Sequence, residues 1–321
     1  MLKNHMNILI LGGAGFLGNN LVRRCLQNVK NKITVVDSLE PKLNPNFQYL
    51  KEVVSKIIFI KGDIRNKDLM ARVIRNQDVI FNCAGQTSHP LSLKDPLFDA
   101  KINCLGNLII LEAVRKYNKK AKLIYTSSST LIGKAVGETV DEKHGEKPLN
   151  IYSANKGVAE KYYYIYSKVH GLTTLSLRFS NLYGPYGKGL PEFGFINYFI
   201  SLAAQNKEIP IYGNGRQIRN VMYVEDAADL LYQCATKKEI FNDVYFAVHR
   251  EHYSILEIAK TIISVFTKGK IKKIPWPNLR KKIEIDNIYI SGAKLFYKIK
   301  WEPKYNLREG LIRTKEIVEK S

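Results

Sequence analysis

The sequence lacks several features that would remove it from the ordinary globular proteins. No apolar run approaches the roughly 18 residues that a membrane-spanning helix needs. The first six residues contain neither the apolar stretch nor the cleavage site of a signal peptide. Only four cysteines occur among 321 residues, and they are too widely spaced for a disulfide framework or a metal site. We therefore expect a cytoplasmic chain with free thiols, no membrane partner and no metal.

Acidic residues are scarce relative to basic ones. The chain has 29 Asp and Glu against 50 Lys and Arg, which gives a net charge of +21. A nucleic-acid binder is one interpretation of that charge. The densest clusters, residues 268–273 and 280–282, nevertheless lack stacking aromatics, and charge alone supports only non-specific binding. We favour a lysine-rich surface, which also attracts small anionic substrates, over a nucleic-acid partner.

A spaced group of glycines near the N-terminus carries the first functional signal. The apolar run Ile8–Leu11 predicts a buried parallel strand, and Gly12, Gly15 and Gly18 follow it. Apolar residues then recur at helical spacing as far as Leu26. A strand, a glycine turn and a helix in this order form a cradle for a pyrophosphate at the helix N-terminus. A glycine-rich turn in some other α/β protein is the simpler alternative.

An acidic residue at the end of the next strand strengthens the dinucleotide interpretation. The strand 32–36 ends in Asp37, nineteen residues after Gly18. That spacing is typical of the carboxylate that binds the adenosine ribose hydroxyls. Because a carboxylate repels a 2′-phosphate, Asp37 favours NAD over NADP as the cofactor.

Polar residues follow several expected strands. They lie at Asp37, at Asp63, at 84–87 and at 127–129. The carboxyl ends of parallel strands open onto one ligand crevice, so these residues are expected to form one wall. The alternation of strands and helices predicts an α/β fold, namely a doubly wound parallel Rossmann sheet followed by a smaller mixed α/β C-terminal lobe.

A tyrosine and a lysine four residues apart carry the expected chemistry. Tyr152 and Lys156 open a predicted helix and lie on one of its faces. The ordinary pKa of a tyrosine is about 10, and a neighbouring ammonium favours the phenolate. Tyr152 is therefore a candidate general base and acid for a sugar or alcohol hydroxyl, and Ser128 at a strand end is a candidate to orient that hydroxyl. The pair alone is common by chance.

Taken together, these motifs resemble the extended short-chain dehydrogenase/reductase family, in particular its NAD-dependent nucleotide-sugar epimerases and dehydratases. The resemblance is of the UDP-glucose 4-epimerase type and covers nearly the whole chain. The motifs occur in the family's order at Gly12, Gly15, Gly18, Asp37, Asp63, Ile64, Ala84, Gly85, Asn103, Ser128, Tyr152, Lys156, 178–185, 212–219 and 223–226.

The resemblance implies a role for each candidate residue. Cofactor contacts are expected at Gly12, Gly15, Phe16, Leu17, Gly18, Asp37, Asp63, Ile64, Ala84, Gly85, Thr87, Asn103, Tyr152, Lys156 and Phe179. Substrate contacts are expected at Ser129, Asn181, Arg219 and Lys281. Arg219, with one of Arg280, Lys281 or Lys282, would clamp the substrate diphosphate, which suits the bidentate geometry of arginine. Without the resemblance, Arg219 is equally a solvated loop cation.

Departures from the family pattern narrow the reaction. Dehydratases of the group carry an Asp-Glu pair where this chain has Ser129 and Thr130, and the glutamate that marks UDP-glucuronate decarboxylases is also missing. Asn220 replaces the usual Asp, and Ile132 replaces a common Tyr. A 4-epimerase of a nucleotide-diphosphate sugar remains, with Tyr152 as acid and base. Alternatives are a 4-keto-sugar reductase, a 2-epimerase of a CDP- or dTDP-deoxysugar, and a dinucleotide-binding scaffold or RNA binder without catalysis.

The resemblance also predicts domains and assembly. Residues 1–181 are expected to form the NAD-binding Rossmann domain, with a return near 220–250, and residues 182–321 are expected to form mainly the nucleotide-sugar lobe. The family often forms homodimers through a four-helix bundle, here built from the predicted helices 97–117 and 153–169. Their apolar stripes are compatible with that arrangement.

Overall fold

A computed structural model describes residues 5–135, 139–282, 284–285 and 287–320. The chain forms two compact units. The first comprises Met1–Ser128, Ile151–Arg178 and Ala228–Tyr245, and the second comprises Ser129–Asn150, Phe179–Ala227 and Phe246–Ser321. Residues 129–150, which the sequence-based division gives to the first domain, group with the second unit. Among the described residues, no helix is long and apolar enough to cross a membrane.

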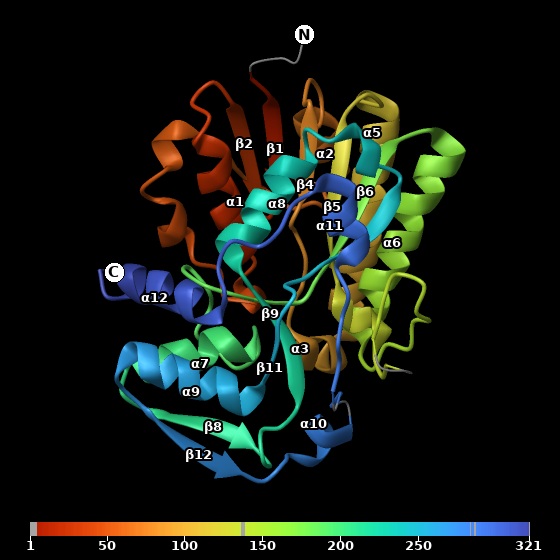
Figure 1. The fold of residues 1–321 in the computed structure, drawn as a ribbon. Helices are drawn as coiled ribbons and strands as arrows, with labels where there is room; N and C mark the ends of the chain where they lie inside the picture. Colours follow the sequence, from red (N-terminus) through yellow and green to blue (C-terminus); the bar gives the residue numbers. More distant parts are fainter. Residues whose placement is uncertain (1–4, 136–138, 283, 286, 321) are drawn as a thin grey trace. The chain divides into compact units, whose positions relative to one another are not determined.

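A seven-stranded sheet forms the centre of the first unit (Figure 1). Its strands, in sheet order, are β10 (Asp243–Ala247), β6 (Thr173–Phe179), β5 (Lys122–Ser128), β4 (Val79–Asn82), β1 (Asn7–Leu11), β2 (Lys32–Asp37) and β3 (Ile58–Lys61). β1 pairs in parallel with both β2 and β4. The chain thus starts at the centre and moves outward in both directions, which creates the switch point where doubly wound sheets bind ligands. The predicted α/β fold is confirmed.

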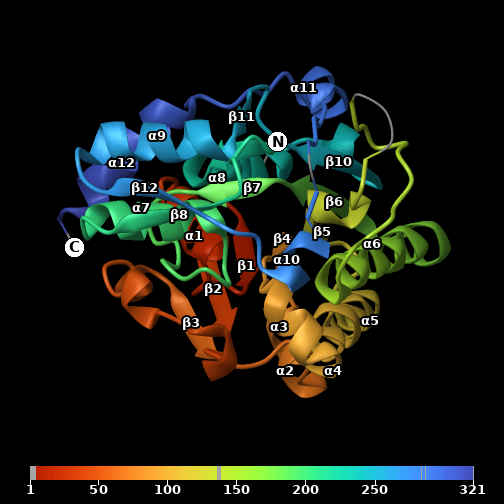
Figure 2. The same cartoon turned by 90° about the horizontal axis from the view of Figure 1, so that it is seen from below.

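Helices cover both faces of this sheet (Figure 2). One face carries α2 (Lys67–Val73), α5 (Asn107–Tyr117) and α6 (Ile151–His170), and the other carries α1 (Phe16–Leu26) and α8 (Val224–Cys234). Met70, Ile110 and Tyr163 of the first three helices pack in one cluster with strand residues. On the opposite face the Arg24 Nε of α1 donates to the Asp229 Oδ1 of α8 at 2.7 Å. Short helices complete this unit at η1 (Pro41–Leu43), η2 (Phe47–Leu50), η3 (Val54–Lys56), α3 (His89–Lys94) and η6 (Lys238–Ile240).

The helix predicted over 97–117 is interrupted by a π-helical turn. The structure has α4 (Pro96–Ala100), the π-helical turn η4 (Lys101–Gly106) and then α5. The side-chain Nδ2 of Asn107 takes the carbonyl oxygen of Asn103 at 2.7 Å, and the backbone N–H of Asn107 turns to Cys104 instead. This exchange breaks the regular hydrogen-bond pattern, and such turns often lie at functional sites.

The second unit contains two small sheets and the helices packed on them. Its strands are β7 (Asn181–Tyr183), β8 (Glu208–Tyr212), β9 (Ile218–Tyr223), β11 (His252–Ser254) and β12 (Lys270–Ile274). Its helices are η5 (Ser129–Ile132), α7 (Phe195–Ala204), α9 (Ile255–Phe266), α10 (Asn278–Lys282), α11 (Ala293–Ile299) and α12 (Leu307–Val318). β9 pairs in parallel with β7 and antiparallel with β11, so the predicted mixed lobe is confirmed. Phe199, Ile262 and Leu311 join α7, α9 and α12 in one core.

Candidate active site

The glycine turn after β1 leaves room that a side chain would fill. Gly12 has φ +78°, and a Cβ there would lie 2.6 Å from the Cα of Ala84. A Cβ at Gly18 would lie 2.2 Å from the carbonyl oxygen of Gly12, so α1 approaches β1 closely. Gly15 is the N-cap of α1, so the helix has no side-chain cap, and its first turn has no acidic residue. This cradle fits the pyrophosphate of a dinucleotide, which backbone N–H groups at the N-terminus of α1 would bind.

Asp37 lies at the carboxyl end of β2 and contacts the same turn. Its Oδ2 accepts from the backbone N–H of Ala14 at 2.9 Å, and its Oδ1 accepts from that of Leu39 at 2.9 Å. These two bonds orient the Asp37 carboxylate toward the glycine turn. The residue stays a predicted cofactor contact, now in a defined orientation.

The remaining predicted cofactor contacts of the first unit have different surroundings. Asp63 binds Arg65 through two hydrogen bonds of 2.9 and 2.6 Å. Partial burial raises the pKa of Asp63, but the hydrogen bonds and charge of Arg65 outweigh it and hold that pKa below its usual range. Ile64 is buried in the core, where it packs against Gly106. Thr87 is exposed, whereas Ala84 and Gly85 are partly exposed.

Ser128 and Tyr152 meet at the end of β5. Tyr152 is 8% exposed and lies in the first turn of α6. Its hydroxyl shares a hydrogen bond with that of Ser128. Burial raises the pKa of Tyr152 to about 12, and the hydrogen bond from Ser128 opposes that rise. Burial therefore outweighs, in the net pKa of Tyr152, the effect that the sequence analysis expected from the neighbouring ammonium of Lys156.

The side chain of Lys156 points to β5, the strand that ends at Ser128. Its Nζ donates to the carbonyl oxygen of Thr126 at 2.5 Å and lies 4.3 Å from the centre of the Tyr125 ring. Burial lowers the pKa of Lys156 to about 8, and the carboxylate of Glu160 acts in the opposite direction. A buried ammonium with one carbonyl partner keeps two N–H donors for a ligand. The structure thus brings Ser128, Tyr152 and Lys156 together at one strand end.

Two neighbours of Tyr152 carry no motif in the sequence. The ring of His89 stacks on the Tyr152 ring, with centroids 4.9 Å apart and an angle of 27° between the planes. Burial lowers the pKa of His89 to about 4, so the imidazole is neutral at pH 7. Asp99 is fully buried and accepts a 2.7 Å hydrogen bond from Asn155, which stands between Tyr152 and Lys156. The sequence does place Asp99 four residues before the predicted Asn103, on the same face of the predicted helix 97–117.

Some of the predicted site residues of the second unit bind other groups of the protein, and the others differ in their exposure. Arg219 donates to the carboxylate of Glu284 and to the carbonyl oxygen of Ile285. Lys281 is exposed on α10, and the side chain of Arg280 lies outside the described residues. Ser129 is buried in η5, and Phe179 is buried at the end of β6. Asn181 Nδ2 donates to the carbonyl oxygen of Asn220 at 2.9 Å. The ion pair with Glu284 was not predicted.

Asn220, which replaces the family's usual Asp, is a buried hydrogen-bonding centre. Its Nδ2 donates to the carbonyl oxygens of His249 at 2.6 Å and Glu251 at 3.1 Å. Its Oδ1 accepts from the Ser180 hydroxyl at 2.7 Å and from the His249 N–H at 3.0 Å. A carboxylate cannot donate to two carbonyls, so an amide suits this position.

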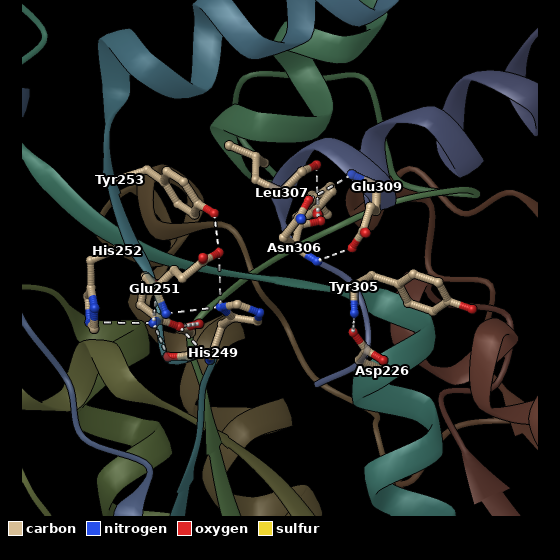
Figure 3. Close-up of polar contacts among 12 residues, drawn as sticks. Asp226, His249, Glu251, His252, Tyr253, Tyr305, Asn306, Leu307 and Glu309 are labelled. Atoms are coloured by element: carbon tan, nitrogen blue, oxygen red, sulfur yellow. Dashed lines mark hydrogen bonds and ion pairs between the residues drawn. The ribbon is translucent and has the colours of Figure 1, made fainter. Parts of the chain in front are cut away.

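The loop held by Asn220 is itself a polar cluster (Figure 3). The Tyr253 hydroxyl donates to Glu251, and the Glu251 N–H donates to His249 Nδ1 at 3.0 Å. Elsewhere in the same view, Asp226 accepts from the Tyr305 N–H at 3.1 Å. These contacts order the loops of the second unit around β9.

Comparison with known proteins places this geometry in a family. The sequence profile of the NAD dependent epimerase/dehydratase family matches residues 8–245. A CDP-paratose 2-epimerase of Salmonella typhi is 29% identical over 334 aligned residues, which cover 95% of this chain and 97% of that protein.

Two solved structures share the fold. The UDP-glucose 4-epimerase of Thermotoga maritima, crystallised with UDP-glucose, has a TM-score of 0.88 and 27% identity, covering 98% of this chain and 99% of that one. The UDP-glucose 4-epimerase of Thermus thermophilus, in complex with NAD, has a TM-score of 0.87 and 26% identity over the same shares. With the dinucleotide cradle and Asp37, these matches show that the chain belongs to the NAD-dependent epimerase/dehydratase family, whose members are extended short-chain dehydrogenase/reductase enzymes acting on nucleotide sugars.

Proposed function

We propose that this enzyme inverts C4 of a nucleotide-diphosphate sugar through a transient 4-keto sugar. The observation that carries the proposal is the hydrogen-bonded pair Ser128 and Tyr152 beside the buried ammonium of Lys156. A phenol in this setting is suited to exchange one proton with a sugar hydroxyl. NAD, when bound, supplies the hydride acceptor and a positive charge that favours the phenolate.

Each residue of the trio has a separate task. Tyr152 takes the proton of the 4-hydroxyl group when the sugar is oxidised and returns a proton to the carbonyl oxygen when the opposite face is reduced. Ser128 orients the reacting oxygen through its own hydroxyl. Lys156, with its remaining N–H donors, binds the nicotinamide ribose and keeps a positive charge near Tyr152.

The residues after Ser128 support epimerisation over dehydration. Ser129 is buried and Thr130 follows it in η5. Neither hydroxyl is acidic enough to serve as the carboxylic acid and carboxylate that elimination of water requires. The oxidised sugar then has one productive outcome, which is reduction on the other face.

The substrate class follows from charge and from the solved relatives. We assign cofactor binding to the first unit and nucleotide-sugar binding mainly to the second. Arg219 and Lys281 are the proposed diphosphate contacts, since arginine matches phosphate oxygens in a bidentate way. A UDP-hexose or its N-acetyl form is the favoured substrate, which the likeness to the UDP-glucose-bound Thermotoga maritima enzyme supports.

A second candidate function is 2-epimerisation of a CDP- or dTDP-deoxysugar, or reduction of a 4-keto sugar. The full-length match to a CDP-paratose 2-epimerase favours the former specifically. The same trio serves in all three reactions, because each needs hydride transfer at a sugar carbon and a proton at its oxygen.

We also propose a homodimer assembled through a four-helix bundle. Large apolar side chains are exposed on the α4–α5 segment and on α6, including Leu105, Tyr164 at 56% and Val169 at 69% exposure. A second copy of the same surface would cover them. A cytoplasmic setting is part of the proposal, and the four free thiols support it.

One experiment tests the reaction directly. The purified protein is incubated with UDP-, dTDP-, CDP- and GDP-sugars, and the anomeric protons are followed by NMR while absorbance at 340 nm reports NADH. Conversion between 4-epimers with no net NADH change is the expected result. Inversion at C2 or steady NADH consumption would establish the second candidate, and no conversion of any sugar would contradict both.

A further inference from the structure

Asp99 is a fully buried carboxylate that accepts hydrogen bonds from three side-chain amides. Gln86 Nε2 donates to its Oδ2 at 2.6 Å. Asn103 Nδ2 and Asn155 Nδ2 donate to its Oδ1 at 3.1 and 2.7 Å. All three of these partners are neutral, so the charge of the carboxylate is solvated by dipoles and is not cancelled by a bonded cation.

The three donors come from three separate segments of the first unit. Gln86 lies in the loop after β4, between the predicted cofactor contacts Gly85 and Thr87. Asn103 lies in the π-helical turn, and its Nδ2 also donates to the carbonyl oxygen of Gln86 at 2.9 Å. Asn155 lies in the first turns of α6. One carboxylate therefore links the cofactor loop, the π-helical turn and the catalytic helix.

Asn155 transmits this contact to the proposed acid–base pair. It stands three residues after Tyr152 and immediately before Lys156. Its Nδ2 is held by Asp99, and its Oδ1 accepts from the thiol of Cys104 at 3.2 Å. An amide fixed at both ends fixes the rotation of α6 about its own axis, and that rotation sets where the Tyr152 and Lys156 side chains emerge.

Stability alone is a weak reason to keep such a group. Burial of a carboxylate without a bonded cation is unfavourable, and apolar replacements of buried charges are often neutral or stabilising. The hydrogen bonds offset that cost only when all of them form together. All the hydrogen bonds can form only when the cofactor loop, the π-helical turn and α6 have one relative position. In that position Tyr152 meets Ser128.

We propose that Asp99 is a positioning residue for the Tyr152–Lys156 pair: its carboxylate joins the cofactor loop, the π-helical turn and α6, and so fixes the reacting phenol and the ammonium in place. The inference rests on the proposed function of that pair. Asp99 is fully buried and acts through Gln86, Asn103 and Asn155.

The charge of Asp99 gives the proposal a measurable signature. Lys156 faces the carboxylates of Glu160 and Asp99, the Cys83 thiol, the Tyr125 ring and the Thr126 carbonyl. The negative charge of Asp99 favours protonated Lys156.

Tyr152 faces Ser128, His89 and Asp99. The same charge disfavours the Tyr152 phenolate. Removing the negative charge of Asp99 lowers the pKa of Tyr152 and that of Lys156, so both limbs of the pH–rate profile are expected to move to lower pH.

The experiment compares Asp99→Asn with the wild-type enzyme under saturating substrate. We expect kcat to fall by about 10- to 100-fold, as for a catalytic group displaced by about 1 Å, with KM changed less than about twofold. Both limbs of the kcat profile should move to lower pH. A wild-type kcat, or a lower kcat with an unmoved profile, would overturn the positioning role, since a merely structural residue does not shift the profile.

Gln86→Met provides a second variant if Asp99→Asn fails to fold. It removes the donor to Asp99, together with the hydrogen bonds between the Gln86 amide and the Ser88 backbone, and keeps the carboxylate. The melting temperature should fall, and kcat should fall by about tenfold with KM and pH profile unchanged. An unchanged kcat would contradict the proposal.

Asp229→Asn is the matched control. Asp229 is another buried carboxylate of this unit and accepts hydrogen bonds of 2.7 Å from Arg24 and Gln233. Its replacement should lower the melting temperature without moving the pH profile.

Tyr152→Phe, assayed in parallel, separates this inference from the proposed function. An active Tyr152→Phe enzyme would refute the acid–base role whatever Asp99 does. An inactive Tyr152→Phe enzyme together with a wild-type Asp99→Asn enzyme would refute only the positioning role.

Discussion

The charges nearest the candidate chemistry in the first unit and the candidate diphosphate contact in the second unit are held in different ways. In the first unit, Lys156 donates to a backbone carbonyl, and Asp99 accepts from neutral amides. In the second unit, Arg219 is bound to the carboxylate of Glu284, and Arg250 is bound to that of Glu302. Charges at the candidate chemistry thus have dipolar partners, whereas the candidate diphosphate contact has an ionic one.

The two kinds of partner have different consequences for ligand binding. A buried charge held by fixed dipoles is already oriented before a ligand arrives and needs little rearrangement when charge develops. An arginine in an ion pair must exchange its carboxylate for a phosphate, so part of the binding energy is spent on the exchange. We expect mutations in the first unit to act on kcat and mutations around Arg219 to act on KM.

The largest expected effect is that of Tyr152→Phe, which should lower kcat by about 10²-fold or more, on the scale of acid–base catalysis. The phenyl ring keeps the stacking on His89 and loses the hydroxyl that meets Ser128. Steady-state kinetics by NMR measure the loss. Tyr164→Phe, on the exposed side of the same helix, is the matched control and should retain wild-type kcat. A kcat within twofold for Tyr152→Phe would remove the catalytic role from the first unit.

The next effect concerns the framework of the second unit. Asn220→Asp should destabilise the protein by about 1–3 kcal/mol, because a buried carboxylate would face the carbonyl oxygens of His249 and Glu251. Chemical denaturation measures the change. Asn214→Asp is the control, since Asn214 is exposed and its side-chain oxygen accepts from the Arg216 N–H. Equal stabilities of the two variants would show that the loop adapts to an anion at position 220.

A smaller effect tests the ion pair itself. Glu284→Gln replaces a charge-assisted partner of Arg219 with a neutral one, which weakens the competitor of the diphosphate by about 1 kcal/mol. We expect KM for the nucleotide sugar to fall by about fivefold at constant kcat. Glu302→Gln, which breaks the exposed pair with Arg250, should leave KM unchanged. A raised KM in Glu284→Gln would mean that Glu284 orients Arg219 and does not compete for it.

A further effect is an acid sensitivity of the first unit. Because the pKa of His89 is about 4 in the folded protein against 6.5 in its ordinary state, the unfolded chain binds more protons between those values. The free energy of unfolding therefore rises with pH from about 4 to about 6.5 through this group. His89→Phe keeps a stacked ring and should flatten that rise in denaturation curves at pH 4.5, 5.5 and 6.5. An unchanged slope would place the acid sensitivity elsewhere, for example at His249 or His252, whose pKa values burial also lowers.

Local pattern made parts of the site predictable. The glycine spacing and the strand-terminal Asp37 predicted a dinucleotide cradle, because those residues act through the backbone within a short segment. The Tyr152–Lys156 spacing predicted one helical face for the same reason. The pKa of Tyr152 was not predictable in this way, since it depends on burial by residues distant in the sequence.

Other parts required contacts between distant segments. Asp99 meets Gln86 and Asn155 across separations of 13 and 56 residues, and Arg219 meets Glu284 across 65. The π-helical turn arises where the Asn107 side chain takes a backbone carbonyl, which apolar periodicity does not register.

Local sequence patterns were enough to predict the α/β architecture and the cofactor cradle and to name Tyr152 as the candidate phenol, because periodicity, glycine placement and helical spacing act over a few residues. The tertiary structure alone decided which partner each charge has: amides for Asp99, a carbonyl for Lys156 and a carboxylate for Arg219. The physical reason is that the behaviour of a charge depends on the dipoles and ions within a few ångströms, and folding brings those groups together from remote parts of the chain.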